Sequence, residues 1–210
     1  NYETLSFFEE ALANIKQVYR ADPHMFAYDL HPGYLSSQWA LKQCARTQAV
    51  CRGIQHHYAH VASVIAEHGI GDTPIIGIAF DGTGYGLDGT LWGSEFLLFE
   101  RSQFIRYAHF SYLPLPGAEQ AIRECWRIAV AFIFQAFDRH ERMEILDRLG
   151  FITKYGEQKI QQMLSLCSLQ SFSPLSCGAG RYFDAVSALI GLCDISTYEG
   201  EAAIALESIM

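Results

Sequence analysis

The chain has 210 residues, of which 50% are hydrophobic and 18% charged, and this is the composition of a globular protein that can bury a sizeable core. The formal net charge of −8 argues against a broad phosphate-neutralising surface, so nucleic acid is not an expected partner. No membrane association is expected either, because the most apolar run, residues 128–137, is about half as long as a membrane-spanning helix.

The six cysteines lack a C-x-x-C spacing and lie mostly in apolar surroundings; they are Cys44, Cys51, Cys125, Cys167, Cys177 and Cys193. This pattern favours reduced, buried thiols and a cytoplasmic protein. The alternative is a disulfide framework, which a chain of this length with a large core does not need.

The first third of the chain predicts alternating helices and strands. Apolar residues recur at helical spacing over 5–19, a short buried strand is expected over 25–30, and a second helix over 34–46. A third helix carries Gln55-His56-His57-Tyr58-Ala59-His60 and ends at Gly69.

The middle of the chain predicts a sheet. Residues 74–80 form a continuous apolar run, typical of a strand buried on both faces, and a glycine-rich turn follows. Two further antiparallel strands are expected over 90–98 and 104–112. After that the pattern is helical, over 118–137, 139–149, 156–170, 180–193 and 199–210. We therefore divide the chain into an α/β part, 1–112, and a mainly helical part, 113–210.

Two histidines suggest a metal site. His56 and His60 are one helical turn apart, so their imidazoles can share one divalent ion, and Asp81 at the end of a strand could supply a third ligand. The alternative is a polar helix face with partly exposed histidines. His57 lies off that face and is expected to support the ligands, to face substrate or to be solvated.

The glycine-rich turn suggests a phosphate site beside the metal. In Asp81-Gly82-Thr83-Gly84 the glycines let backbone N–H groups approach a phosphate closely. An ordinary hairpin is the alternative. The order of strand, glycine turn and strand resembles the first phosphate loop of the actin-like ATPase superfamily.

A second glycine-rich segment precedes a helix at Gly180, and such a helix start suits an anion or a ribose. Asp184 could accept hydrogen bonds from ribose hydroxyls, or could simply favour the helix dipole. Gly200 opens another helix with the same ambiguity. Arg123 and Arg127 are expected on one helix face, facing acids, substrate or solvent.

Eight motifs follow one another along the chain. They are Ala27-Tyr28-Asp29-Leu30-His31-Pro32, the histidine segment 55–60, the glycine turn 81–86, Trp92-Gly93-Ser94-Glu95-Phe96, Leu113-Pro114-Leu115-Pro116-Gly117, Ala121-Ile122-Arg123-Glu124, Gly180-Arg181-Tyr182-Phe183-Asp184-Ala185-Val186 and Tyr198-Glu199-Gly200. In this order they resemble the C-terminal, threonylcarbamoyl-transferase-related region of the HypF carbamoyltransferases, over essentially the whole chain.

The resemblance implies an α/β protein of the actin-like ATPase or ribonuclease-H-like fold, with a mixed sheet flanked by helices. It implies transfer of a carbamoyl group from carbamoyl-adenylate to the C-terminal cysteine of the partner HypE, a step toward the cyanide ligands of nickel-iron hydrogenases. Carbamoyl phosphate and ATP would be used by upstream domains outside this chain.

When the family's functional positions are carried over residue by residue, the resemblance implies that His56, His60 and Asp81 are metal ligands. The metal could be zinc, iron or magnesium. Gly82, Thr83, Gly84, Gly180, Asp184 and Gly200 would contact ATP or carbamoyl-adenylate. No catalytic residue is assigned, and Cys125 and Cys177, which stand where proline and serine are usual, are not expected to be catalytic.

The family's late segment, with a further acidic ligand, has no counterpart before Met210, so a truncated fragment is expected. Two alternatives stay open. One is a tRNA threonylcarbamoyl transferase-like enzyme, although its phosphate loop is Ser-Gly-Gly rather than Asp81-Gly82-Thr83-Gly84. The other is an inert fragment that acts only as a binding module.

Overall fold

The computed structural model describes residues 2–71, 73–100 and 103–210. They form two compact units, residues 1–59 and 60–210, and the boundary lies inside the helix α3 (His56–His68). The predicted boundary at residue 112 separates the mixed part of the sequence from the mainly helical part. The boundary between the two compact units lies earlier in the chain, between residues 59 and 60.

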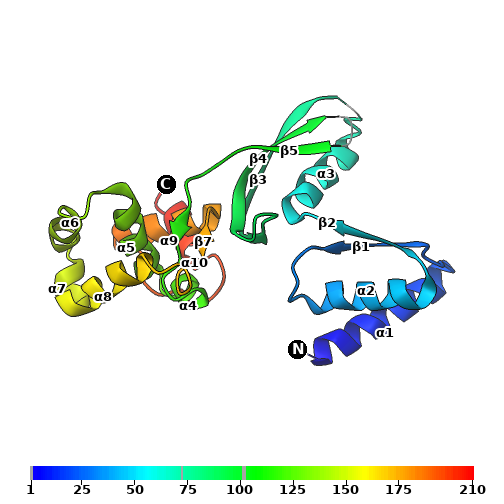
Figure 1. Ribbon diagram of the computed structural model, residues 1–210, viewed down its shortest axis with the longest axis horizontal. Helices are drawn as coiled ribbons and strands as arrows, with labels where there is room; N and C mark the ends of the chain where they lie inside the picture. The colour runs from blue at the N-terminus through cyan, green and yellow to red at the C-terminus, as the bar shows by residue number, and fades with distance from the viewer. Residues whose placement is uncertain (1, 72, 101–102) are drawn as a thin grey trace. The chain divides into compact units, whose positions relative to one another are not determined.

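The first unit is built around a β-α-β element. Strands β1 (Met25–Asp29) and β2 (Val50–Ile54) pair in parallel, and α2 (Leu35–Thr47) connects them, as a parallel pair requires (Figure 1). The helix α1 (Tyr2–Tyr19) precedes β1. Trp39 of α2 holds these parts together, since its ring meets Phe8 of α1 and Phe26 of β1 edge to face. The strand β2 was not predicted.

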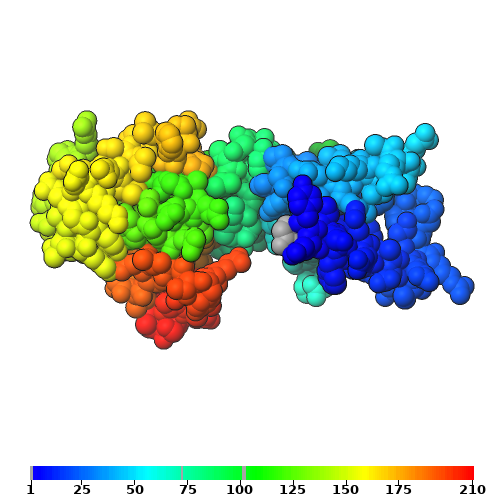
Figure 2. Space-filling model, turned by 90° about the horizontal axis from the view of Figure 1, so that it is seen from below, coloured from blue at the N-terminus to red at the C-terminus, as the bar shows by residue number. Residues whose placement is uncertain are grey.

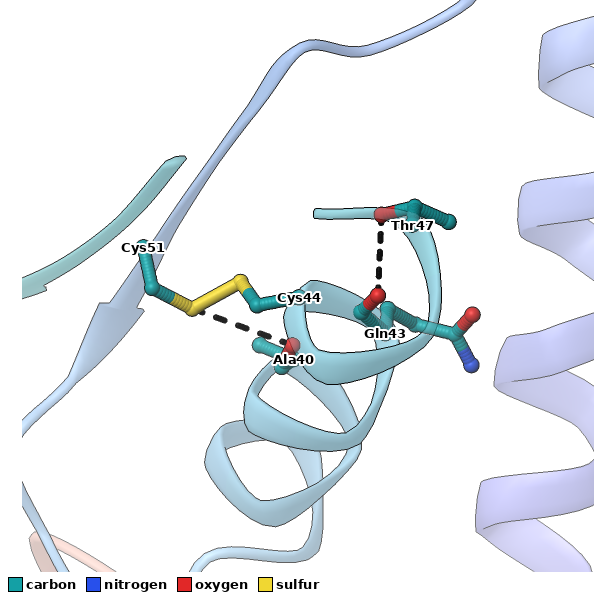
Figure 3. Close-up of a disulfide and its surroundings, with 5 residues drawn as sticks. All are labelled: Ala40, Gln43, Cys44, Thr47 and Cys51. Carbon is teal, nitrogen blue, oxygen red and sulfur yellow. Dashed lines mark hydrogen bonds between the residues drawn. A yellow bond between two sulfur atoms is a disulfide. The ribbon is translucent and has the colours of Figure 1, made fainter. Parts of the chain in front are cut away.

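A disulfide joins Cys44 to Cys51, with the two Cα atoms 6.0 Å apart (Figure 3). The expectation that all six cysteines are reduced is therefore wrong for this pair. The cause is local: Gln48 adopts a left-handed conformation after α2, and the chain turns back so that the second residue of β2 lies beside the last turn of α2. The other four cysteines are free and buried, as expected.

The second unit contains a five-stranded mixed sheet, which confirms the predicted sheet type. Strands β3 (Ile75–Tyr85), β4 (Leu91–Glu100) and β5 (Gln103–His109) form the predicted antiparallel meander (Figure 1). Two short strands, β6 (Leu113–Pro114) and β7 (Leu175–Ser176), extend it, and β7 runs parallel to β4. The β3–β4 register shifts between Phe80 and Gly84, so the glycine turn is an irregular segment inside β3 and does not follow the strand as predicted; the chain reverses at residues 86–90.

Seven helices follow in the described part of the second unit. Most match the predicted ranges, but the helix expected over 118–137 is broken at Glu124, and residues 151–155 form a separate short helix. They are α4 (Glu119–Arg123), α5 (Cys125–Ala136), α6 (Arg142–Arg148), α7 (Phe151–Tyr155), α8 (Glu157–Cys167), α9 (Ala179–Leu189) and α10 (Glu201–Glu207).

The helix α5 is the centre of the core. Seven of its twelve residues are buried, including Trp126 and Ile128, so it is apolar almost all round. Its neighbours α8, α9 and α6 bury Ile160, Ala188 and Leu146 against it. Within the described ranges, no helix combines the length and the apolar character that crossing a membrane requires.

Candidate functional site

The helix α3 presents two of the predicted ligands. The candidate ligand atoms of His56 and His60 lie within 4.8 Å of each other, and those of His60 and Asp81 lie within the same distance. His60 is exposed, while His56 and Asp81 are half-buried. His56 and His60 thus lie one turn apart on α3, and Asp81, inside β3, lies beside His60; two imidazoles and a carboxylate are a donor set that suits a divalent ion.

Asp29, at the end of β1, orients His56. Its Oδ2 lies 2.7 Å from Nδ1 of His56, and its Oδ1 accepts from the backbone N–H of His31. A proton held on Nδ1 leaves the ring's lone pair on Nε2, which is the carboxylate–histidine arrangement common at metal sites. Sequence reasoning did not assign Asp29, although its place at the carboxyl end of a strand could have indicated it.

The three glycine segments of the second unit are packed backbone to backbone. A Cβ on Gly178 would lie 2.3 Å from the carbonyl oxygen of Gly82, and a Cβ on Gly93 would lie 2.5 Å from that of Asp81. A Cβ on Gly180 would lie 3.0 Å from the Cα of Gly82. These glycines allow the start of α9 to approach the glycine turn inside β3, which no larger residue permits without movement.

A cavity of about 400 Å³ opens where these segments meet. It joins the glycine turn, the end of α4, the first turns of α9 and the loop before α10. Figure 2 shows orange residues directly beside the green residues, and Ser196 N, in the loop before α10, donates to Arg123 O at the end of α4. The cavity is lined by Asp81, Gly82, Thr83, Ile122, Arg123, Arg181, Asp184, Ser196, Thr197, Tyr198, Glu199 and Gly200.

The lining contains five of the predicted site residues: Asp81, Gly82, Thr83, Asp184 and Gly200. Gly84 and Gly180 are not among the lining residues, and Gly180 instead packs against Gly82. His57 is completely buried, with Gln55 Nε2 3.2 Å from its Nδ1, so the solvated alternative for His57 is wrong.

Asp184 is paired inside the cavity wall. Its Oδ2 lies 2.9 Å from Nη2 of Arg181, and both residues are buried. Burial raises the pKa of Asp184, and the Arg181 guanidinium opposes this only in part. Arg181 was not predicted as a site residue, although it directly follows Gly180 at the helix start.

The break at Glu124 separates the two arginines that were expected on one face. Arg123 ends α4, is exposed and lines the cavity. Arg127 belongs to α5, and its Nε donates to Glu124 at 2.5 Å. Because the helix is interrupted at Glu124, Arg123 lines the cavity, whereas Arg127 forms a structural ion pair with Glu124.

Two family models match this chain. One, described as the HypF Kae1-like domain, covers residues 1–67, and the other, described as the second subdomain of a carbamoyltransferase Kae1-like domain, covers residues 77–210. The chain belongs to the HypF family.

The sequences of HypF relatives are similar to this chain over nearly its whole length. A carbamoyltransferase HypF from Synechocystis is 40% identical over 98% of this chain, and HypF2 from Cupriavidus necator is 39% identical over 100% of it. These matches span 27% and 25% of the two relatives. The chain therefore spans about a quarter of the length of the curated HypF proteins it matches.

Solved HypF structures confirm the Kae1-like, actin-like fold. A full-length HypF, crystallised in a phosphate- and nucleotide-bound form, superposes with a TM-score of 0.87 at 37% identity. T. kodakarensis HypF superposes with a TM-score of 0.86 at 31% identity. The first covers all of this chain with 26% of its own length, and the second covers 99% with 28%.

Proposed function

We propose that the chain is the nucleotide- and metal-binding part of a HypF-type carbamoyltransferase, which passes a carbamoyl group from carbamoyl-adenylate to the C-terminal cysteine of HypE. The observation that carries the proposal is the cavity that joins the glycine turn to Arg181 and Asp184. Membership of the HypF family supports the reaction class.

The cavity suits a nucleotide by its chemistry. The backbone of Thr83 offers a donor beside Gly82, whose own N–H donates to Oδ1 of Asp81, while Arg123 and Arg181 bring two guanidinium groups that can face phosphate. Asp184 and the loop at Gly200 bring acceptors for ribose hydroxyls. A relative described as phosphate- and nucleotide-bound supports this assignment.

A divalent cation fits His56, His60 and Asp81, because two imidazoles and a carboxylate are suitable ligands for it. The cation could be zinc, iron or magnesium. The carboxylate of Asp29 on Nδ1 of His56 is the supporting contact such a ligand needs. When bound, the cation would polarise a phosphate or carbamoyl oxygen.

The chain's own residues hold and orient the donor. The HypE thiolate attacks the carbamoyl carbon, the bond from that carbon to the phosphate oxygen breaks, and AMP leaves with its phosphate held at the glycine turn. The nucleophile comes from the partner, because Cys125 and Cys177 are fully buried and burial raises the pKa of each thiol to about 11.

Carbamoyl phosphate and ATP would be converted to carbamoyl-adenylate by domains that this chain does not include. A cytoplasmic location is part of the proposal, supported by the four buried free cysteines, while the Cys44–Cys51 disulfide argues in the other direction.

The test supplies the purified chain with synthetic carbamoyl-adenylate and HypE, and measures carbamoylation of the HypE C-terminal cysteine by intact-protein mass spectrometry. A mass increase of one carbamoyl group that Asp81→Asn abolishes is expected. Nucleotide and HypE binding without transfer would instead identify an inert binding module. In a parallel reaction with threonylcarbamoyl-adenylate as donor, transfer to tRNA would favour the tRNA-modifying alternative, which the net charge of −8 disfavours.

A further inference from the structure

The motif Trp92-Gly93-Ser94-Glu95 on β4 contributes no residue to the cavity lining, yet it contains a completely buried carboxylate, Glu95. Glu95 accepts five hydrogen bonds. Two come from its own strand, where the N–H groups of Gly93 and Ser94 lie 3.2 and 3.4 Å from Oε1. Another comes from the thiol of Cys177, which lies 3.2 Å from the same oxygen.

The remaining two bonds come from Arg106 on β5. Its Nε lies 2.6 Å from Oε2 of Glu95, and its Nη2 lies 3.2 Å from Oε1. The guanidinium stacks 3.8 Å from the ring centre of Trp92 and donates to the hydroxyl of Tyr112 at 2.8 Å. This two-pronged pair, covered by an aromatic ring, holds the carboxylate in one orientation.

Glu95 thereby joins two backbone segments that are distant in the chain. One is Gly93, whose missing Cβ lets it lie against Asp81 O and the Cα of Gly178. The other is Cys177, directly before Gly178, whose missing Cβ lets it lie against Gly82 O. Both segments touch the Asp81-Gly82 turn, and Glu95 holds both.

We propose that Glu95 is a positioning residue, which sets the shape of the Asp81-Gly82 turn and the start of α9 by holding Gly93 and Cys177 on one buried carboxylate. Its effect on ligand binding rests on the function proposed above, but its effect on the backbone does not. Glu95 is completely buried and Arg106 is 17% exposed, and because such an ion pair contributes little net stability, selecting one conformation is the role that we assign to it.

The experiment compares Glu95→Gln with Arg127→Gln in the full chain. Arg127 is a matched control, because it forms an ion pair with Glu124 and is 17% exposed, as Arg106 is, but bonds no residue of the turns. Hydrogen–deuterium exchange without ligand should be about tenfold faster in Glu95→Gln at residues 81–84 and 177–180, and unchanged there in Arg127→Gln. Equal exchange in both variants at these residues would overturn the proposal.

Nucleotide binding is the second readout. Glu95→Gln should bind ATP about tenfold more weakly at a temperature where it is fully folded, while Arg127→Gln binds as the wild type does. If the wild type binds no ATP, the proposed function fails for this chain, and the exchange experiment alone decides the role of Glu95.

A milder variant covers the case in which Glu95→Gln does not fold. Tyr112→Phe removes only one hydroxyl that Arg106 bonds, and should raise exchange in the same two segments by a smaller factor. An increase spread evenly over the second unit would show that the network only stabilises the fold, and would overturn the positioning role.

Discussion

The imidazole of His56 is held by the carboxylate of Asp29, whose Oδ2 lies 2.7 Å from Nδ1. Asp29 lies at the carboxyl end of β1, and His56 is the first residue of α3. A carboxylate in this place raises the basicity of a ligating histidine and fixes its ring, which gives a test of the metal proposal that leaves the three ligands intact.

We predict that Asp29→Ala lowers zinc affinity by about 10- to 100-fold. Isothermal titration with a competing chelator measures the affinity, and circular dichroism checks that the first unit remains folded. Asp22→Asn is the control, because Asp22 is an exposed acid of the same unit whose ion pair with Lys16 spans 3.8 Å. Equal zinc affinity in Asp29→Ala and wild type would exclude a supporting role for Asp29.

Gly82 and Gly178 should respond differently to alanine. A Cβ on Gly82 meets only Nη2 of Arg181, at 3.7 Å, whereas one on Gly178 would lie 2.3 Å from a backbone carbonyl. Gly178→Ala should therefore destabilise the chain by about 1–3 kcal/mol. Gly82→Ala should change stability by less than about 1 kcal/mol but reduce ATP affinity, because the methyl group enters the cavity.

Urea unfolding and ATP titration separate the two effects. The expected pattern is a stability loss in Gly178→Ala and a selective affinity loss in Gly82→Ala. Unchanged ATP affinity in a stable Gly82→Ala protein would show that the ligand does not approach this turn.

Acid should destabilise the second unit through Asp88 and Glu95. Although burial acts to raise it, the pKa of Asp88 falls from 3.8 to about 2 through hydrogen bonds from Thr90, Trp92 and Tyr112. Burial also acts to raise the pKa of Glu95, but hydrogen bonds from Arg106 and Cys177 hold it below its ordinary 4.5. Below these ordinary values the unfolded chain binds more protons than the folded chain, so stability falls as the pH falls.

Thermal melting between pH 7 and pH 2 checks this. The melting temperature should decline below about pH 4.5, and Asp88→Asn should make the decline between about pH 4 and pH 2 shallower. Because the Asp88 side chain is 45% exposed, added salt should also reduce its contribution. An identical decline in Asp88→Asn and wild type would contradict the assignment.

Reduction should loosen the first unit. The Cys44–Cys51 bond closes a short loop, with a sequence separation of 7, and a loop of this length contributes about 2 kcal/mol in the chain-entropy model. Melting with and without a thiol reductant should show a lower transition for residues 1–59 when reduced. The double variant Cys44→Ser, Cys51→Ser should melt alike in both conditions, and a wild type insensitive to reductant would refute the prediction.

The sequence predicted most elements because their signals are local. The helical period of α1 and the apolar run that begins β3 are each read within a few residues, whereas the turn predicted directly after that run lies inside β3. The short strands β6 and β7 were not predicted, because two residues carry no periodicity and their pairing depends on partners far along the chain. The disulfide was not predicted, because no sequence pattern near Cys44 indicates that the chain reverses at Gln48.

The residues of the candidate site were likewise predicted where the signal is local, and missed where it depends on distant parts of the chain. Spacing placed His56 and His60 together, and the end of a strand placed Asp81. The pairing of Arg181 with Asp184 and the assignment of Gly180 to packing required the fold, because both depend on how closely α9 approaches Gly82. Glycine in a sequence does not reveal whether a ligand or another backbone occupies the space beside it.

The contact between Gly178 and the Gly82 carbonyl joins two segments that are far apart in the sequence. These residues are separated by β4, β5 and all of α4 to α8, so the cavity can form only after most of the second unit has closed. We therefore expect a nucleotide that requires this cavity to bind only after the rate-limiting step of folding. In stopped-flow experiments it should slow unfolding and leave the rate of folding unchanged.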